Sequence, residues 1–187
     1  MLSTALSLSR SRLSTSSKRR FASYTGPQWH IVVLVLAVAV VAQATLLHFL
    51  AVRGATPSLV LVAVVWFAIR VDARKAAIYG LLAGIFEDVL AAGTGGAWTI
   101  STTVTAMLTS VLSRGFFADS IPIVAAVTAI ATLVRALIFW AVMSLEGYPG
   151  GLAGMHFHQA LWQALLNVVV MIVAMLIARR FETVPRS

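Results

Sequence analysis

Three ionisable side chains lie inside long apolar stretches of this 187-residue chain, namely Glu87, Asp88 and Arg135. A charged group in an apolar, membrane-like environment is costly and is normally paired. Asp88 lies 12 residues past Ala76, where its apolar stretch begins, which is about 18 Å along a helix. Arg135 lies 14 residues past Ile121, the start of another stretch, or about 21 Å along. The similar depths predict that Arg135 pairs with Asp88 or with Glu87.

The last apolar stretch carries four polar side chains whose spacings of 3, 4 and 4 residues place them on one helix face. This polar stripe consists of His156, Gln159, Gln163 and Asn167. Gln163 is 15 residues from Ala178, near the predicted inner end, or about 22 Å, which matches the depth of Arg135. A polar cluster is therefore predicted in the outer half of a helix bundle.

This predicted cluster has three interpretations. Its side chains would bond to one another between helices, form a docking site for a partner protein, or line a small-molecule pocket open to the outside. The first is the plainest, because buried polar groups usually find partners within the protein. A metal site is not favoured, because His156 and His158 are two residues apart and point to different faces. No Ser/His/Asp order or phosphate-binding loop indicates an enzyme, and the lack of cysteine excludes thiol catalysis.

Small residues recur every four positions in the stretch that leads to Glu87 and Asp88. Ala76, Gly80, Gly84 and Asp88 follow one another every four residues. Small residues at this spacing let another helix approach closely within a membrane. We therefore expect this face, with Asp88 near it, to point into the bundle.

The composition indicates that these residues are positioned by transmembrane helices. Apolar residues make up 60% of the chain and charged residues only 11%, against about 25% in soluble domains. Barrel-like alternation is missing and long apolar runs take its place, so the expected fold is all-α. Six such runs lie at about 31–50, 58–69, 76–92, 97–112, 121–143 and 157–178.

The second run is the shortest, since a span needs about 20 residues. It would reach the full length only if its helix continued past Arg70 toward Asp72, with the arginine reaching back to the membrane surface. The third and fourth runs are marginal in length.

Basic residues predict the orientation. With the N-terminus inside, the inner segments hold twelve of the fourteen Lys and Arg residues: five in the N-terminal tail, three in 70–75, Arg114, and three at the C-terminus. Only Arg53 lies outside, and Arg135 lies within a span. This positive-inside pattern predicts a polytopic protein with six transmembrane helices and both termini in the cytoplasm. It also accounts for the net charge of +8 without nucleic acid.

The chain divides accordingly into a basic, Ser/Arg-rich tail (1–30), a six-helix transmembrane domain (31–181) and a short C-terminal tail (182–187). The composition of the N-terminal tail predicts a disordered cytoplasmic segment, and a mitochondrial transit peptide is the alternative interpretation. Anionic lipid headgroups at the inner leaflet are the expected contacts of the inner basic residues. Their plainer role is to set the topology.

Residues 31–181 resemble the MreD family, the membrane component of the bacterial rod-shape (elongation) system. The resemblance rests on Pro57-Ser58-Leu59, Ile69-Arg70, the run from Gly80 to Leu90, Gly93, Gly96 and Phe139-Trp140. It implies a multi-pass protein of the bacterial plasma membrane with no enzymatic activity and no cofactor. The implied partners are the bitopic protein MreC and the elongation-complex proteins that organise peptidoglycan synthesis.

Only the positions of Gly80, Gly84 and Asp88 transfer as family motif positions. On this interpretation a groove lined by the two glycines would accept a partner's transmembrane helix.

A second resemblance is to the substrate-capture subunits of energy-coupling-factor vitamin transporters, which have six short helices, a similar glycine–acid third span and a fold like that attributed to MreD. On that interpretation the vitamin ligands would be Arg135, Gln159, Gln163 and Asn167. Against it, only Trp98 and Tyr148 stand out as aromatic residues of the outer loops.

Overall fold

The computed structural model describes residues 28–46, 51–91, 94–114 and 120–182. The described part is helical, with no strand and only an isolated bridge between Val52 and Ala55. The elements are α2 (Trp29–Leu46), α3 (Leu59–Ala68), α4 (Ala73–Ala91), α5 (Ala97–Leu112), α6 (Ile121–Leu145), the short 3-10 helix η2 (Gly150–Leu152) and α7 (Ala153–Glu182). The predicted all-α class is therefore confirmed. The predicted tails lie mostly outside the described residues, and α2 begins at Trp29.

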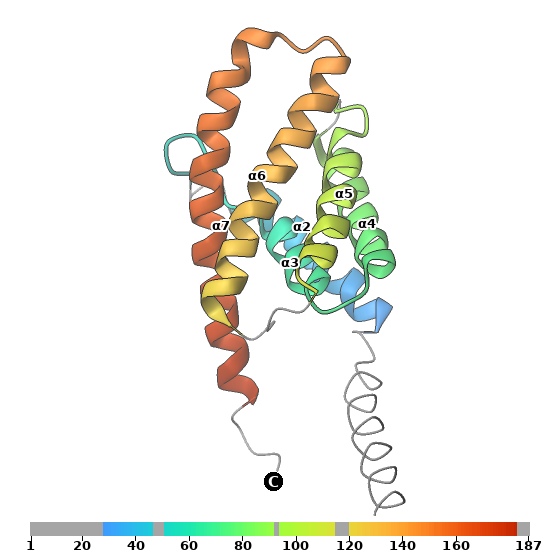
Figure 1. Ribbon diagram of the computed structural model, residues 1–187, viewed down its shortest axis with the longest axis vertical. Coiled ribbons are helices and arrows are strands. Elements are labelled where there is room, and N and C mark those ends of the chain that lie inside the picture. Colours follow the sequence, from blue (N-terminus) through green and yellow to red (C-terminus); the bar gives the residue numbers. More distant parts are fainter. Residues whose placement is uncertain (1–27, 47–50, 92–93, 115–119, 183–187) are drawn as a thin grey trace, which may run out of the picture.

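Helix α3 lies at the centre of the bundle and joins two apolar cores. One core is formed with α2 and α4 and includes Val60, Val64 and Phe67 of α3. The other is formed with α6 and α7 and includes Leu61 and Val65. Figure 1 shows α6 and α7 as a long antiparallel pair on one side, with α4 and α5 together on the other. The even burial around α3 explains its unbroken apolar sequence.

Helices α6 and α7 expose large apolar side chains outward. Leu137, Leu161, Leu165 and Val169 are each more than half exposed. Such a surface is suited to lipid and unsuited to water. By length and composition, two segments are able to cross a membrane, Ile121–Leu145 and Gly150–Arg180, while α2, α3 and α5 are apolar but shorter.

The condition under which the second span would reach full length is not met, and the span is short, as its apolar run indicated. Helix α3 has ten residues, about 15 Å or half of a hydrocarbon core, and it ends at Ala68 instead of continuing toward Asp72. The Arg70 guanidinium turns back over the Trp66 ring at 4.0 Å and donates to the Trp66 carbonyl oxygen at 2.8 Å. The bounds predicted for α5 are confirmed, and α7 begins earlier than expected, at Ala153.

Because α3 is short, its N-terminus lies deep in the bundle. The structure describes the turn before α3 from residue 51 onward. This turn lies beside α7, about a third of the way along that helix (Figure 1). There the Arg53 guanidinium lies 4.7 Å from the Trp162 ring centre. This arrangement brings the start of α3 to the same level as the predicted polar cluster.

Candidate functional site

Arg135 pairs with Glu87, one of its two predicted partners. Arg135 Nη1 lies 3.0 Å from each carboxylate oxygen, and both side chains are buried, at 2% and 7% exposure. Glu87 also accepts a bond from the Thr102 hydroxyl at 3.2 Å. Arg135 Nη2 donates to Ser58 Oγ at 3.3 Å, and its guanidinium lies 4.8 Å from the Trp98 ring centre. The charge that topology left unexplained is thus neutralised inside the bundle.

Asp88 has a different role, although it adjoins Glu87. Its carboxylate accepts from the backbone N–H groups of Trp98 and Thr99 at 3.2 and 2.8 Å and from the hydroxyls of Thr94 and Thr99 at 2.6 and 2.5 Å. Helix α5 begins after Gly96, which has no side chain to cap it and has a φ of 90°. Asp88 on α4 therefore caps the N-terminus of α5.

The two glycines of α4 pack against α5 of the same chain. A Cβ at Gly80 would lie 2.7 Å from the Thr102 carbonyl oxygen and from Ala106 Cβ. A Cβ at Gly84 would overlap the backbone of Thr99. Close approach at these positions was predicted and is present. The prediction that a partner's helix occupies a groove at these glycines is wrong, because α5 of the same chain already lies there.

Three side chains satisfy the buried N-terminus of α3. The first N–H groups of a helix have no partner within it, and a membrane interior supplies none. Asn167 Oδ1 accepts from Ser58 N at 2.7 Å, Gln43 Oε1 from Val60 N at 3.3 Å, and Ser58 Oγ from Leu61 N at 3.2 Å. Side chains from α2 and α7 therefore enable a helix to begin inside the bundle.

Three of the four side chains of the polar stripe on α7 are within hydrogen-bond distance of other parts of the chain. Asn167 Nδ2 donates to Thr132 Oγ1 at 3.0 Å, and Gln163 Nε2 donates to the Thr56 carbonyl oxygen at 3.0 Å. His156 Nε2 lies 3.0 Å from the Ala136 carbonyl oxygen. Gln159 is the exception, because its amide forms no hydrogen bond with the described residues.

Two adjoining cavities flank Arg135. The inner cavity, of about 240 Å³, lies between the 54–56 turn, α6 and α7, and the side cavity, of about 390 Å³, lies between α2 and α4. They share Thr56, Trp98, Arg135 and Gln163. Gln159 lines the inner cavity. The guanidinium therefore forms part of the wall of both cavities, whereas its counter-ion Glu87 lines only the side cavity.

Aromatic rings gather at the outer end of the inner cavity. The Trp98 and Phe139 rings have centres 4.2 Å apart, and His156 stacks on Phe139 at 5.8 Å with an 18° angle between planes. Trp140 contacts His156, and Tyr148 contacts Trp140 edge-on. Trp98 and Tyr148, the two aromatic residues singled out for the outer loops, both belong to this group, and α6 and α7 add Phe139, Trp140 and His156.

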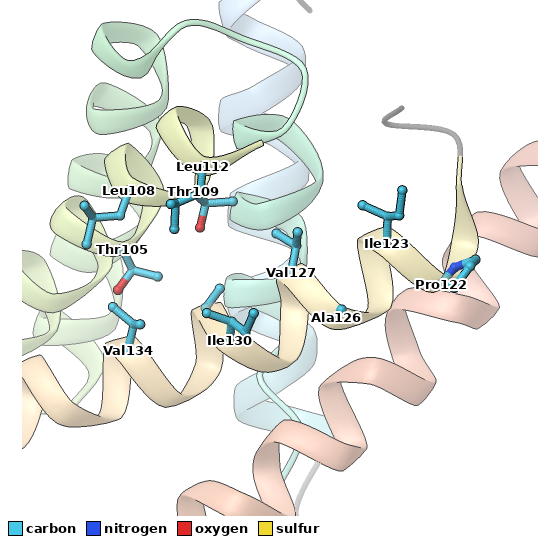
Figure 2. A pocket seen from close by; sticks show the side chains of 11 residues that line it. Thr105, Leu108, Thr109, Leu112, Pro122, Ile123, Ala126, Val127, Ile130 and Val134 are labelled. Atoms are coloured by element: carbon cyan, nitrogen blue, oxygen red, sulfur yellow. The ribbon is translucent and has the colours of Figure 1, made fainter. Parts of the chain in front are cut away.

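A separate apolar groove runs between α5 and α6, with a volume of about 470 Å³. Figure 2 shows side chains from both helices facing it, from Leu112 and Pro122 near the inner end to Thr105 and Val134. Thr105 is 1% exposed, and its hydroxyl has no hydrogen-bond partner among the described residues. The groove is thus apolar apart from the hydroxyl groups of Thr105 and Thr109, and that of Thr105 is buried and unsatisfied.

Sequence reasoning missed the roles of Gln43, Thr56 and Ser58. A serine after a proline is a common helix N-cap, and it would have placed the start of α3 at Leu59. Gln43 is a lone glutamine near the end of an apolar run, where its amide needs a hydrogen-bond partner. Its position would therefore have indicated a structural role. No group of three or more potential metal ligands occurs among the described residues.

The arrangement neutralises buried charge, caps two helices and leaves two adjoining cavities beside Arg135. The family model for the rod shape-determining protein MreD matches residues 25–182. No match was found among curated proteins or solved structures. The match covers nearly the whole chain and favours the shape-determining interpretation over vitamin capture. The chain belongs to the MreD family of rod shape-determining membrane proteins.

Proposed function

We propose that this protein is a non-enzymatic scaffold of the bacterial elongation machinery. It would hold a bitopic MreC-like protein and the membrane proteins of peptidoglycan synthesis in register, and so maintain cell shape. Family membership supports the role in shape determination. The observation that carries the scaffolding role is the apolar groove between α5 and α6, which the described residues leave unfilled.

The proposed topology is six spans in the plasma membrane with both termini in the cytoplasm. Residues 31–181 would form the transmembrane domain, between tails at 1–30 and 182–187. The second span would combine α3 with the turn before it, whose backbone is satisfied by Gln163 and Asn167. The distribution of basic residues supports this orientation.

The partner's transmembrane helix is the occupant that fits the α5–α6 groove. An acyl chain has nothing to offer the unpartnered hydroxyl of Thr105, whereas a helix carries carbonyl oxygens and small polar side chains. Ala126 and Ala131 provide small positions on the α6 wall. Without a strong hydrophobic force between helices in lipid, such close packing and hydrogen bonding drive association.

The inner basic residues would anchor the scaffold at the cytoplasmic leaflet. Arg74 and Lys75 are exposed at the start of α4, and Arg114 follows α5. Near anionic headgroups each basic residue contributes about 1 kcal/mol of attraction. Arg70 belongs to the same end and is already held against Trp66.

Co-purification with a co-expressed MreC-like bitopic protein tests this proposal. An Ala126→Trp variant fills the groove, and Ala141→Trp makes the same change on the exposed surface of α6 outside the groove. We expect the first variant to lose at least about tenfold in captured partner, equivalent to about 1.4 kcal/mol, and the second to capture it normally. Equal capture by both variants would contradict docking in the groove. Failure of the unmodified protein to capture the partner would contradict the scaffold itself.

A further inference from the structure

The guanidinium of Arg135 has hydrogen-bonding capacity left over. A guanidinium has five N–H donors in a fixed plane. Nη1 bonds to both oxygens of Glu87, and Nη2 bonds to Ser58 Oγ. Nε and the second hydrogen of Nη2 have no acceptor among the described residues. Because Arg135 is buried and lines both cavities, these donors need an acceptor from outside the bundle.

Gln159 presents a second unsatisfied group in the inner cavity. The other members of the stripe, from His156 to Asn167, each bond to a neighbouring helix or turn. Gln159 is half-buried, and its amide faces the turn at Gly54 without bonding to it. An amide offers two donors and one acceptor, so it pairs with a group that carries both.

An aromatic surface forms one wall of the same cavity. Trp98, Phe139 and His156 all line it, and their rings lie against one another at centre distances of 4.2 and 5.8 Å. Because these rings cover one another's faces, they present their edges, and a flat molecule placed against them gains an edge-to-face contact beyond the burial of its area. Polar groups at the base of the cavity and rings near its mouth therefore suit different parts of one ligand.

The electrostatics of the cavity favour a neutral ligand. Arg135 lines the cavity and is balanced by Glu87, which lies 3.0 Å behind it, so the ion pair carries no net charge. An anion would leave water without an uncompensated cation among the lining residues to pair with it, which is costly. A neutral carbonyl oxygen, by contrast, can accept from the guanidinium and from the Gln159 amide at no such cost.

We propose that the inner cavity binds a small, neutral, planar ring that carries a carbonyl or carboxamide group. The carbonyl oxygen accepts from Arg135 and Gln159, and the ligand ring packs against the edges of the Trp98 and Phe139 rings, whose faces are covered by one another, by His156 and by Arg135. A volume of about 240 Å³ corresponds to about eight water molecules at about 30 Å³ each. It suits one ring with a short substituent, since sites for drug-sized ligands start at about 300 Å³.

This site lies between α6, α7 and the turn before α3, apart from the α5–α6 groove. Ligand binding and partner capture are therefore separable, and either one can fail without the other.

Three matched probes test the proposal: nicotinamide, nicotinate and 3-methylpyridine. They share one ring and differ in carrying a neutral carboxamide, an anionic carboxylate or no carbonyl. Binding to the full-length protein in lipid nanodiscs is followed by ligand-observed NMR titration. Gln159→Leu removes the free amide, and Gln28→Leu makes the same change at an exposed position outside the bundle. Neither residue holds a helix in place, so both variants are expected to fold.

We expect nicotinamide to bind with at least about tenfold preference over the other two probes. Gln159→Leu should weaken it about threefold to tenfold, the effect of one lost hydrogen bond, and Gln28→Leu should leave it unchanged. Equal or tighter binding of nicotinate would overturn the preference for a neutral ligand. Absence of binding by all three probes, or binding that Gln159→Leu leaves unchanged, would mean that the cavity holds only water.

Discussion

Arg135 on α6 and Glu87 on α4 form a buried ion pair in which Nη1 lies 3.0 Å from each carboxylate oxygen. The same guanidinium bonds to Ser58 at the start of α3. One side chain therefore joins three helices at the level where α3 begins. We therefore expect the loss of this ion pair to lower the stability of the folded protein rather than to affect any reactivity.

Breaking the pair from one side should be costly. Glu87→Gln leaves a buried guanidinium without its counter-ion and should destabilise the protein by about 3–5 kcal/mol. Combining it with Arg135→Met removes both charges and should recover most of that loss. Thermal unfolding in a fixed detergent measures both variants. Equal stability of the single and double variants would show that the ion pair does not exist in the folded protein.

Removing the cap on α5 should have a smaller effect. Asp88→Ala takes away the acceptor of two backbone N–H groups and two hydroxyls, so a loss of about 1–3 kcal/mol is expected. The matched control is Glu146→Ala, an exposed carboxylate at the C-terminal end of α6, which should change stability by less than about 0.5 kcal/mol. Urea titration of both variants distinguishes them. Unchanged stability of the Asp88→Ala variant would refute the capping role of Asp88.

The contact between α4 and α5 should not tolerate a larger residue at Gly84. Gly84→Leu forces the side chain into the Thr99 backbone, and separating the helices should also disturb the neighbouring cap at Asp88. We expect a strong loss of folded yield, measured by fluorescence-detected gel filtration. Gly150→Leu, where an added Cβ meets open space, should give normal yield.

The buried start of α3 should depend on Asn167. Asn167→Leu leaves the Ser58 N–H without its acceptor and removes the bond to the Thr132 hydroxyl, which keeps its own bond to the Thr128 carbonyl oxygen, and it should cost about 1–3 kcal/mol. Leu165→Ala, on the exposed side of α7, is the control and should be nearly neutral. Hydrogen exchange adds a local measurement, because the first amides of α3 should lose protection selectively. Unchanged exchange there would contradict the role assigned to Asn167.

The sequence was sufficient to predict the helices and the depth of the charged residues. Regular rise along a helix placed Arg135 level with the acidic pair, and this estimate needs no knowledge of the neighbours. It left Glu87 and Asp88 as equal candidates, because adjacent residues differ in direction by about 100° and only the positions of α5 and α6 distinguish them. The charge pattern likewise gave an orientation but no helix packing.

The misplaced docking groove has a related physical cause. A small-residue face shows that some helix packs closely, and its sequence does not say whether that helix belongs to the same chain. Gly80 and Gly84 receive α5, whereas the open groove lies between α5 and α6 among residues with no distinctive motif. The aromatic wall was missed for the same reason, since Trp98 and Phe139 meet only through tertiary packing.

The docking position can be mapped directly, because the chain contains no cysteine. Single cysteines at Ala126 in the groove, Ile78 on the exposed side of α4 and Leu165 on α7 are labelled with benzophenone maleimide and illuminated in membranes that contain the bitopic partner. A crosslink to the partner's transmembrane helix from position 126, with little from the other two, is the predicted result. A crosslink from position 78 or 165 with none from position 126 would contradict docking between α5 and α6.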